Sequence, residues 1–173
     1  MRTARLFALC LVPLATACGS AGGRAASGGD AHGLVGVHAP SFSRSAVAGG
    51  GQLSTESAKG KVMIVDFWAT YCEPCAKEFP KLQAIADKYA GSVVVYALSE
   101  DDATDGISGF VKKTGVRFPV AWDESNAISQ RYKLEKMPTS FVVDKKGIVR
   151  FVHGGYTEGE ADEIGREVER LLR

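Results

Sequence analysis

Cys72 and Cys75 are the residues of this chain best suited to chemistry. Two residues separate them, a spacing that occurs in redox-active disulfides and also in half of a zinc site. An apolar run precedes the pair and a helical pattern follows it, which places the cysteines at the start of a helix. The positive end of the helix dipole favours thiolate at Cys72 over thiol. The pattern therefore predicts thiol–disulfide exchange, with Cys72 as the exposed nucleophile and Cys75 as the resolving thiol.

A metal site is the first alternative for this pair. Zinc would need two further ligands, and the other candidates in the chain are two N-terminal cysteines and three histidines. Cys10 and Cys18 lie in a segment that is expected to be processed, and His32 and His38 lie in or near an expected tether. Only His153 is left for the folded part. No metal is therefore expected.

The first 17 residues have the pattern of an export signal: two arginines, an apolar run too short to span a bilayer, and small residues before Cys18. The residues around Cys18 resemble a bacterial lipobox, in which the cysteine is acylated and becomes the mature N-terminus. An ordinary secretory signal is the alternative. We expect a signal peptide at 1–17, a lipidated N-terminus with a flexible glycine-rich tether at 18–33, and one folded domain at 34–173.

Charge and cysteine content limit the possible functions. The formal net charge is +1, and removal of the expected signal leaves 19 basic against 20 acidic residues. No basic field remains for nucleic acid, so membrane association is expected through the lipid instead. Loss of Cys10 and Cys18 leaves one cysteine pair in an oxidising compartment, and a disulfide across two residues closes almost no loop. The pair is thus expected to serve chemistry rather than stability.

The elements that must hold the pair follow from hydrophobic periodicity. Residues 62–67 form a nearly continuous apolar run, typical of a central strand buried on both faces. Residues 140–144 and 148–152 flank Lys-Lys-Gly as the strands of an antiparallel hairpin do. The other expected elements are an N-terminal hairpin around 49–51, a helix over 79–89, a strand over 93–98, helices near 107–111 and 125–132, and a last helix with apolar residues from 164 to 172. The expected class is α/β, a mixed central β-sheet with helices on both faces.

The stretch 65–75, Val-Asp-Phe-Trp-Ala-Thr-Tyr-Cys-Glu-Pro-Cys, resembles the thioredoxin superfamily. Together with 76–80, Ala-Lys-Glu-Phe-Pro, it is similar to the TlpA/ResA branch of membrane-tethered thiol-disulfide oxidoreductases, and the likeness covers about residues 36–173. The resemblance implies a thioredoxin-like fold and a redox-active disulfide with no other cofactor. It also implies reduction of disulfides in partner proteins outside the cytoplasm, notably in cytochrome c maturation. Recharging by a membrane electron donor of the DsbD/CcdA type is implied as well.

The same resemblance assigns roles to residues outside the cysteine pair. Pro138 would be the family's cis-proline beside the disulfide, with the Met137 backbone free to pair with a substrate chain; a trans proline that ends a loop is the alternative. Asp66 stands where thioredoxins bury an aspartate that exchanges the proton of the second cysteine, although the TlpA/ResA branch often has asparagine there. A carboxylate on a buried strand should have a raised pKa and could act as base for Cys75. Glu78 matches a glutamate near the substrate cavity, or is a solvated helix residue.

Four more residues are expected to form the substrate-binding surface: Trp68, Tyr71, Glu73 and Pro74. Glu73 also bears on the direction of exchange. A carboxylate roughly 7 Å from the Cys72 sulfur, at an effective dielectric near 40, costs the thiolate about 1 kcal/mol. A less stable thiolate favours the reduction of other disulfides over their formation.

Two other functions stay open. A thiol peroxidase would need a peroxide pocket around Cys72. A copper-binding assembly factor of thioredoxin fold would use both cysteines and a histidine, for which His153 is the candidate. The acidic run 100–102 lacks the spacing of a calcium loop and is expected to be a solvated loop.

Overall fold

The computed structural model describes residues 32–173. The expected signal peptide, the expected lipid anchor at Cys18 and most of the expected tether lie outside this range. The ring of His32 already packs edge-on against Phe141, with 5.2 Å between ring centroids, and one of its ring nitrogens lies 3.3 Å from the carbonyl oxygen of Lys133. The folded part therefore begins at least two residues before the expected boundary at residue 34.

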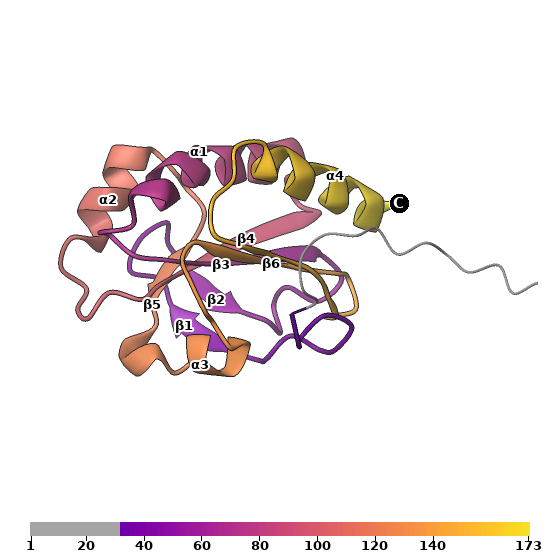
Figure 1. Ribbon diagram of the computed structural model, residues 1–173, viewed down its shortest axis with the longest axis horizontal. Coiled ribbons are helices and arrows are strands. Elements are labelled where there is room, and N and C mark those ends of the chain that lie inside the picture. The colour runs from indigo at the N-terminus through magenta and orange to yellow at the C-terminus, as the bar shows by residue number, and fades with distance from the viewer. Residues whose placement is uncertain (1–31) are drawn as a thin grey trace, which may run out of the picture. The chain divides into compact units, whose positions relative to one another are not determined.

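The centre of the fold is a five-stranded sheet with the order β5-β4-β3-β6-β7 (Figure 1). Strand β3 runs parallel to β4 and antiparallel to β6, so the sheet is mixed, as expected. A separate antiparallel pair, β1 and β2, forms the expected N-terminal hairpin. The strands are β1 (Ser43–Ser45), β2 (Gln52–Ser54), β3 (Val62–Trp68), β4 (Val93–Ser99), β5 (Val120–Trp122), β6 (Thr139–Val143) and β7 (Val149–Gly154).

Helices cover both faces of this sheet. Helices α1, α2 and α4 lie on one face, while α3 and the β1–β2 hairpin lie on the other (Figure 1). The helices are α1 (Glu73–Lys88), α2 (Ile107–Thr114), α3 (Ser129–Tyr132) and α4 (Glu160–Leu172), and a 3-10 turn, η1, spans Glu124–Asn126. The expected helix over 125–132 is interrupted, because Ser125 and Asn126 have positive φ. In the described range, no helix is long and apolar enough to cross a bilayer.

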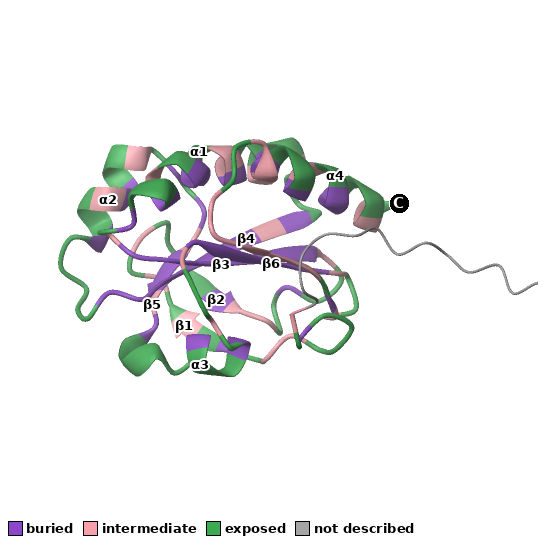
Figure 2. Cartoon of the chain, viewed as in Figure 1, coloured by how far each residue is buried: buried purple, intermediate pink, exposed green. Residues whose placement is uncertain are grey.

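Strand β3 is buried along its whole length, as its continuous apolar sequence predicts (Figure 2). One face of it packs on the α1 side of the sheet and the other on the α3 side, and each side has its own apolar cluster. Asp66 is the only ionisable residue of β3, and it is fully buried. Because the turn from β3 into α1 carries the cysteines, this rigid strand fixes the position of the pair.

Candidate active site

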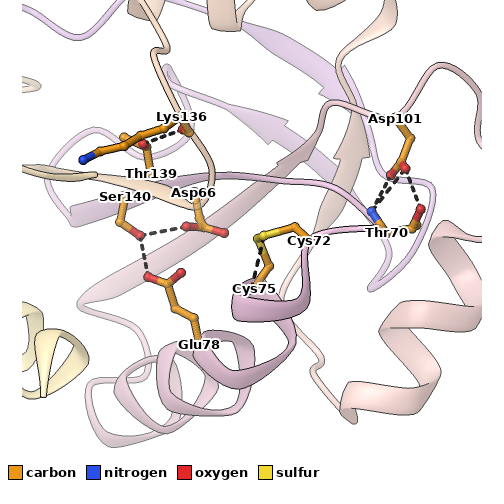
Figure 3. Close-up of a disulfide and its surroundings, with 9 residues drawn as sticks. All are labelled: Asp66, Thr70, Cys72, Cys75, Glu78, Asp101, Lys136, Thr139 and Ser140. Atoms are coloured by element: carbon orange, nitrogen blue, oxygen red, sulfur yellow. Dashed lines mark hydrogen bonds between the residues drawn. A yellow bond between two sulfur atoms is a disulfide. The ribbon is translucent and has the colours of Figure 1, made fainter. Parts of the chain in front are cut away.

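Cys72 and Cys75 form a disulfide at the start of α1, with 5.4 Å between their Cα atoms (Figure 3). Cys72 is the N-cap of the helix, and the backbone N–H of Cys75 donates to the Cys72 sulfur over 3.3 Å. A backbone N–H at a helix N-terminus stabilises negative charge on the atom that it contacts. This geometry supports thiolate at Cys72, as the sequence predicts.

The two sulfurs differ in their access to solvent, but by less than expected. Cys72 is 8% exposed and Cys75 is fully buried. The expectation of an exposed Cys72 is therefore correct only in relation to Cys75, because most of Cys72 is covered in this oxidised form. Cys72 is thus the sulfur of the pair that an incoming molecule can reach.

Asp101 fastens the turn that leads into the disulfide. Its carboxylate accepts from the backbone N–H of Thr70 at 3.0 Å and 3.1 Å and from the Thr70 hydroxyl at 2.6 Å (Figure 3). It also accepts from the Ser99 hydroxyl at 2.6 Å. The expectation of a solvated loop at residues 100–102 is thus wrong for Asp101, and also for Glu100, since each is only 8% exposed. Parallel strands β3 and β4 end at the same edge, so an acid just beyond β4 reaches the turn just beyond β3. The expected parallel pairing of these two strands could therefore have indicated that Asp101 lies next to the turn before Cys72.

Trp68 does not line the active-site surface. Its side chain is fully buried, with its ring centroid 4.8 Å from that of Phe79 and 4.5 Å from that of Phe110. The assignment of Trp68 to the substrate-binding surface is therefore wrong. It is the last residue of β3, and the alternation along the strand turns its ring beneath α1 and α2 rather than toward solvent. Tyr71, in contrast, is 72% exposed next to Cys72.

The peptide bond between Met137 and Pro138 is cis, as the resemblance implies. Pro138 is buried and Met137 is partly exposed. Glu73 and Pro74 are both exposed between the cysteines, but Glu73 is not alone: its Oε1 lies 3.4 Å from the Lys77 ammonium. This pairing reduces the cost that Glu73 imposes on a Cys72 thiolate, so the expected 1 kcal/mol is an upper value.

Two buried carboxyl groups meet at one hydroxyl behind the disulfide. Ser140 Oγ lies 2.8 Å from Asp66 Oδ1 and 3.4 Å from Glu78 Oε1, and in the view of Figure 3 Asp66 lies between Ser140 and the disulfide. Glu78 is only 3% exposed, so the alternative of a solvated helix residue is wrong. Sequence reasoning did not identify Ser140, because a serine in an apolar strand carries no distinctive pattern.

Burial controls the protonation of this group. Burial, and then the charge of Glu78, raise the pKa of Asp66 well above its ordinary value, although the hydrogen bond from Ser140 lowers it in part. Burial, and then the charge of Glu160, raise the pKa of Glu78 to about 7. The expectation of a raised pKa for Asp66 is confirmed. Both acids can therefore hold a proton near neutral pH.

His153, on strand β7, is paired with Ser140 on the neighbouring strand β6. Its side chain connects this site to α4. Its Nε2 lies 2.7 Å from Glu167 Oε2, and its Nδ1 lies 3.6 Å from Glu160 Oε1. Burial by itself lowers the pKa of His153, but the contacts with Glu160 and Glu167 outweigh it and raise the pKa to about 9. Both ring nitrogens face carboxylates, so neither can join the cysteines as a copper ligand without breaking these contacts.

The His153 cluster predicts a specific pH dependence of stability. The pKa of His153 is about 9 in the folded protein against 6.5 for an ordinary histidine. Because the pKa is higher in the folded state, protonated His153 adds to the free energy of unfolding. This contribution is complete below pH 6.5 and is lost as the pH rises through about 9. The difference in free energy of unfolding between wild type and His153→Gln should therefore shrink from pH 6 to pH 10 in urea denaturation.

The Glu167→Gln variant is the matched control for this prediction. It keeps the histidine and removes its closest carboxylate, so the pH dependence between pH 6.5 and 9 should weaken. A difference between wild type and His153→Gln that stays constant over this range would contradict the role assigned to His153.

The fold and the cysteine pair define a class: a thioredoxin-fold protein with a disulfide at the N-terminus of the helix that follows the first central strand. The chain belongs to the AhpC/TSA family, whose model matches residues 35–152. Several of its relatives are named thiol-disulfide oxidoreductases, and the chain is an enzyme of this type. The resemblance to ResA-like proteins is thereby confirmed.

Three similar proteins illustrate the relationship. The thiol-disulfide oxidoreductase ResA of Bacillus thuringiensis subsp. konkukian is 32% identical over 136 residues, which cover 78% of each chain. The crystal structure of a thiol:disulfide interchange protein of the thioredoxin family from Chlorobium tepidum TLS matches with a TM-score of 0.69 and 28% identity, covering 80% of this chain and 97% of that one. StoA from Bacillus subtilis matches with a TM-score of 0.61 and 25% identity, covering 74% of this chain and 96% of that one.

Proposed function

We propose that this oxidoreductase works as a reductase of disulfides in partner proteins. Cys72 attacks the substrate disulfide, Cys75 resolves the mixed disulfide, and an electron donor reduces the pair again. No cofactor beyond the Cys72–Cys75 pair takes part in the proposed reaction. The observation that carries the proposal is the acidic surroundings of the disulfide.

Three carboxyl groups lie near the two sulfurs, one of them between the cysteines in the sequence and two of them in the folded structure. Glu73 lies between the cysteines in the sequence, while Asp66 and Glu78 are buried and lie to one side of the disulfide in the view of Figure 3. When ionised, each of these carboxyl groups disfavours a nearby thiolate, and a disfavoured thiolate makes the dithiol a better reductant. The helix N-terminus acts in the opposite sense and stabilises a thiolate at Cys72. The net effect is expected to be a reduction potential like that of reducing members of the fold.

A hollow of about 410 Å³, which includes the residues next to Cys72 and to Pro138 in the sequence, supports binding of a polypeptide substrate. Tyr71 and Met137 border it on the active-site side, and the rest is lined by Glu100 after β4, by Asn126 of η1, and by residues of α3 and the following turn. No backbone hydrogen bond within residues 32–173 uses the amide or carbonyl of Met137. A substrate chain can therefore pair with the Met137 backbone next to buried Pro138, while Tyr71, Glu73 and Pro74 contact it from the cysteine side.

Asp66 and Glu78 are proposed to manage protons in this reaction. Asp66 is assigned the role of base for Cys75, because it is buried within β3 with a raised pKa. Glu78 of α1, whose pKa is about 7, is proposed to take part in the same transfer of the Cys75 proton. A base with a pKa near the working pH is the most effective one.

The cellular setting is proposed from the N-terminal sequence and the relatives together. The export signal and Cys18 support an extracytoplasmic protein held to a membrane by lipid. The resemblance to the TlpA/ResA branch supports a membrane electron donor of the DsbD/CcdA type and substrates in cytochrome c maturation. Metabolic labelling with a fatty acid, compared between wild type and Cys18→Ala, tests the anchor.

The reduction potential tests the proposed direction. Equilibration with glutathione should give a value near the about −270 mV of thioredoxin and well below the about −120 mV of strong oxidants. Glu73→Gln should raise the potential by at most about 20 mV, because removal of 1 kcal/mol of repulsion corresponds to that shift. Lys77→Gln is the matched control and should lower it, since it leaves the Glu73 charge unpaired.

Other results would redirect the proposal. A potential close to that of the strong oxidants would identify a catalyst of disulfide formation instead. Rapid turnover of hydrogen peroxide with no reduction of insulin would identify a thiol peroxidase. Either result would leave the chemistry of Cys72 and Cys75 in place and change only its substrate or direction.

A further inference from the structure

The Ser140 hydroxyl is shared by two acids that have few other partners. It lies 2.8 Å from Asp66 Oδ1 and 3.4 Å from Glu78 Oε1 (Figure 3). The second oxygen of each acid, Asp66 Oδ2 and Glu78 Oε2, is buried without a hydrogen-bond partner among the described residues. Ser140 itself is fully buried. The hydroxyl is thus the polar contact that the two carboxyl groups have in common.

The number of protons decides how these contacts can form. A serine hydroxyl donates one hydrogen bond and accepts others, while an ionised carboxylate only accepts. With both acids ionised, one of the two contacts to Ser140 would bring two acceptors together without a proton. With one proton on the pair, both contacts become hydrogen bonds: the protonated acid donates to Ser140 Oγ, and Ser140 donates to the ionised acid. The geometry therefore fits a pair of acids that share one proton.

We propose that Ser140 is a positioning residue that relays a proton between Asp66 and Glu78, so that Asp66 can accept the proton that Cys75 loses. The inference rests on the proposed role of Asp66 as the base for Cys75. It adds a route by which buried Asp66 loses its proton again before the next reaction cycle. A double shift through Ser140, in which Asp66 gives a proton to Oγ and Oγ gives its own to Glu78, leaves Asp66 ionised.

The exchange reaction then balances. The S–H bond of Cys75 breaks and its proton moves to Asp66. The Cys75 sulfur bonds to the Cys72 sulfur, and the bond between Cys72 and the substrate sulfur breaks, with both electrons leaving on the substrate sulfur. Both acids now hold a proton. Glu78 releases its own to solvent, and the double shift through Ser140 then moves the remaining proton from Asp66 to Glu78. The pair returns to one proton, and the leaving substrate thiolate takes a proton from solvent.

The charged groups that influence this pair come from α1, α4 and β7. Asp66 is influenced by Glu78 of α1 and by Glu160 of α4. Glu78 is influenced by Glu160, by His153 of β7 and by Lys81 of its own helix. The His153 and Lys81 charges favour the ionised form of Glu78, while the Glu160 charge opposes it. Glu78 is therefore the member of the pair with cations at hand, which suits it to release the proton.

The test is the pH profile of disulfide exchange in single turnover. Reduced full-length protein is mixed with oxidised glutathione, and the formation of the Cys72–Cys75 disulfide is followed from pH 5 to pH 9. Ser140→Ala removes a hydrogen bond that lowers the pKa of both acids, so the acidic limb should move to higher pH by about one unit. Below the midpoint the rate should fall about tenfold.

Two further variants separate a relay from a structural effect. Ser140→Thr keeps a hydroxyl at this position and should return the midpoint to the wild-type value. Tyr132→Phe is the control, because it removes a buried hydroxyl on the α3 side that has no hydrogen-bond partner in the described part of the chain. It should leave the profile unchanged.

The outcome is decisive in either direction. A Ser140→Ala profile that superimposes on that of wild type, or a Ser140→Thr profile that stays shifted, would overturn the relay. This failure is distinct from failure of the proposed function, since oxidation by glutathione reports proton transfer whichever direction operates in the cell. It is also distinct from failure of the base assignment, which an Asp66 variant tests separately.

Discussion

A Cys75→Ser variant is expected to lose turnover by roughly three orders of magnitude or more and to accumulate a mixed disulfide. Cys72 can still attack a substrate disulfide, because it is the less buried of the two sulfurs and receives the Cys75 backbone N–H. A serine hydroxyl at position 75 cannot displace the substrate sulfur, so the covalent intermediate persists. Non-reducing gels and intact-mass measurement detect the adduct, and dithiothreitol should release it.

The Cys72→Ser variant is the matched control. It keeps one thiol, at Cys75, but that residue is fully buried. It should lose turnover equally and form little adduct. Equal trapping by both variants would mean that Cys75 attacks substrates as readily as Cys72, and the assigned order of attack and resolution would be wrong. Adducts captured by Cys75→Ser also identify the partner proteins.

An Asp66→Asn variant is expected to resolve mixed disulfides about a hundredfold more slowly at pH 7 while being more stable than wild type. The rate falls because asparagine cannot take the Cys75 proton. Stability rises because the pKa of Asp66 is raised in the folded protein, mainly by burial, so ionisation of Asp66 costs folding free energy. This cost is absent below the unfolded value of about 3.8 and grows as the pH rises through the folded pKa.

The stability gain should therefore increase with pH and reach about 1–3 kcal/mol, the usual cost of a buried polar group that lacks partners. Urea denaturation at pH 4, 7 and 9 measures it. Asp87→Asn is a control of opposite sign: hydrogen bonds from Arg117 and Gln83 lower the pKa of Asp87, so this variant should be less stable than wild type by an amount that is constant above pH 3.8 and disappears only as the pH falls below that value. A stability gain for Asp66→Asn that is independent of pH, with an unchanged rate of resolution, would remove Asp66 from the mechanism.

The main elements of the fold were predictable from local sequence patterns. The apolar run of β3 is typical of a strand buried on both faces, and the hairpin of β6 and β7 follows from two β-rich segments around Lys-Lys-Gly. The cysteine spacing at the start of α1 and the cis Met137–Pro138 bond were expected from the sequence and its resemblance, and both are present. These features depend on residues that are close together in the chain.

The expectations that failed concern contacts between distant segments. Trp68 was expected on the surface, but the neighbouring helices cover its ring. Asp101 was expected in solvent, yet it fastens Thr70 from the adjacent strand end. Glu78 could have been a solvated helix residue by its sequence alone, and only the position of β6 beneath α1 shows it to be buried. Periodicity assigns a face to a side chain, but not the element that covers that face.

By itself, the sequence determined the chemistry of this protein: two cysteines at a helix start, on a buried strand that carries one acid. The tertiary structure decided how that chemistry is controlled. It brought Ser140 of β6 to Asp66 of β3 and Glu78 of α1, and it placed His153 between two glutamates of α4. Proton affinities depend on burial and on charges within a few ångströms, and such distances between remote residues exist only in the folded chain.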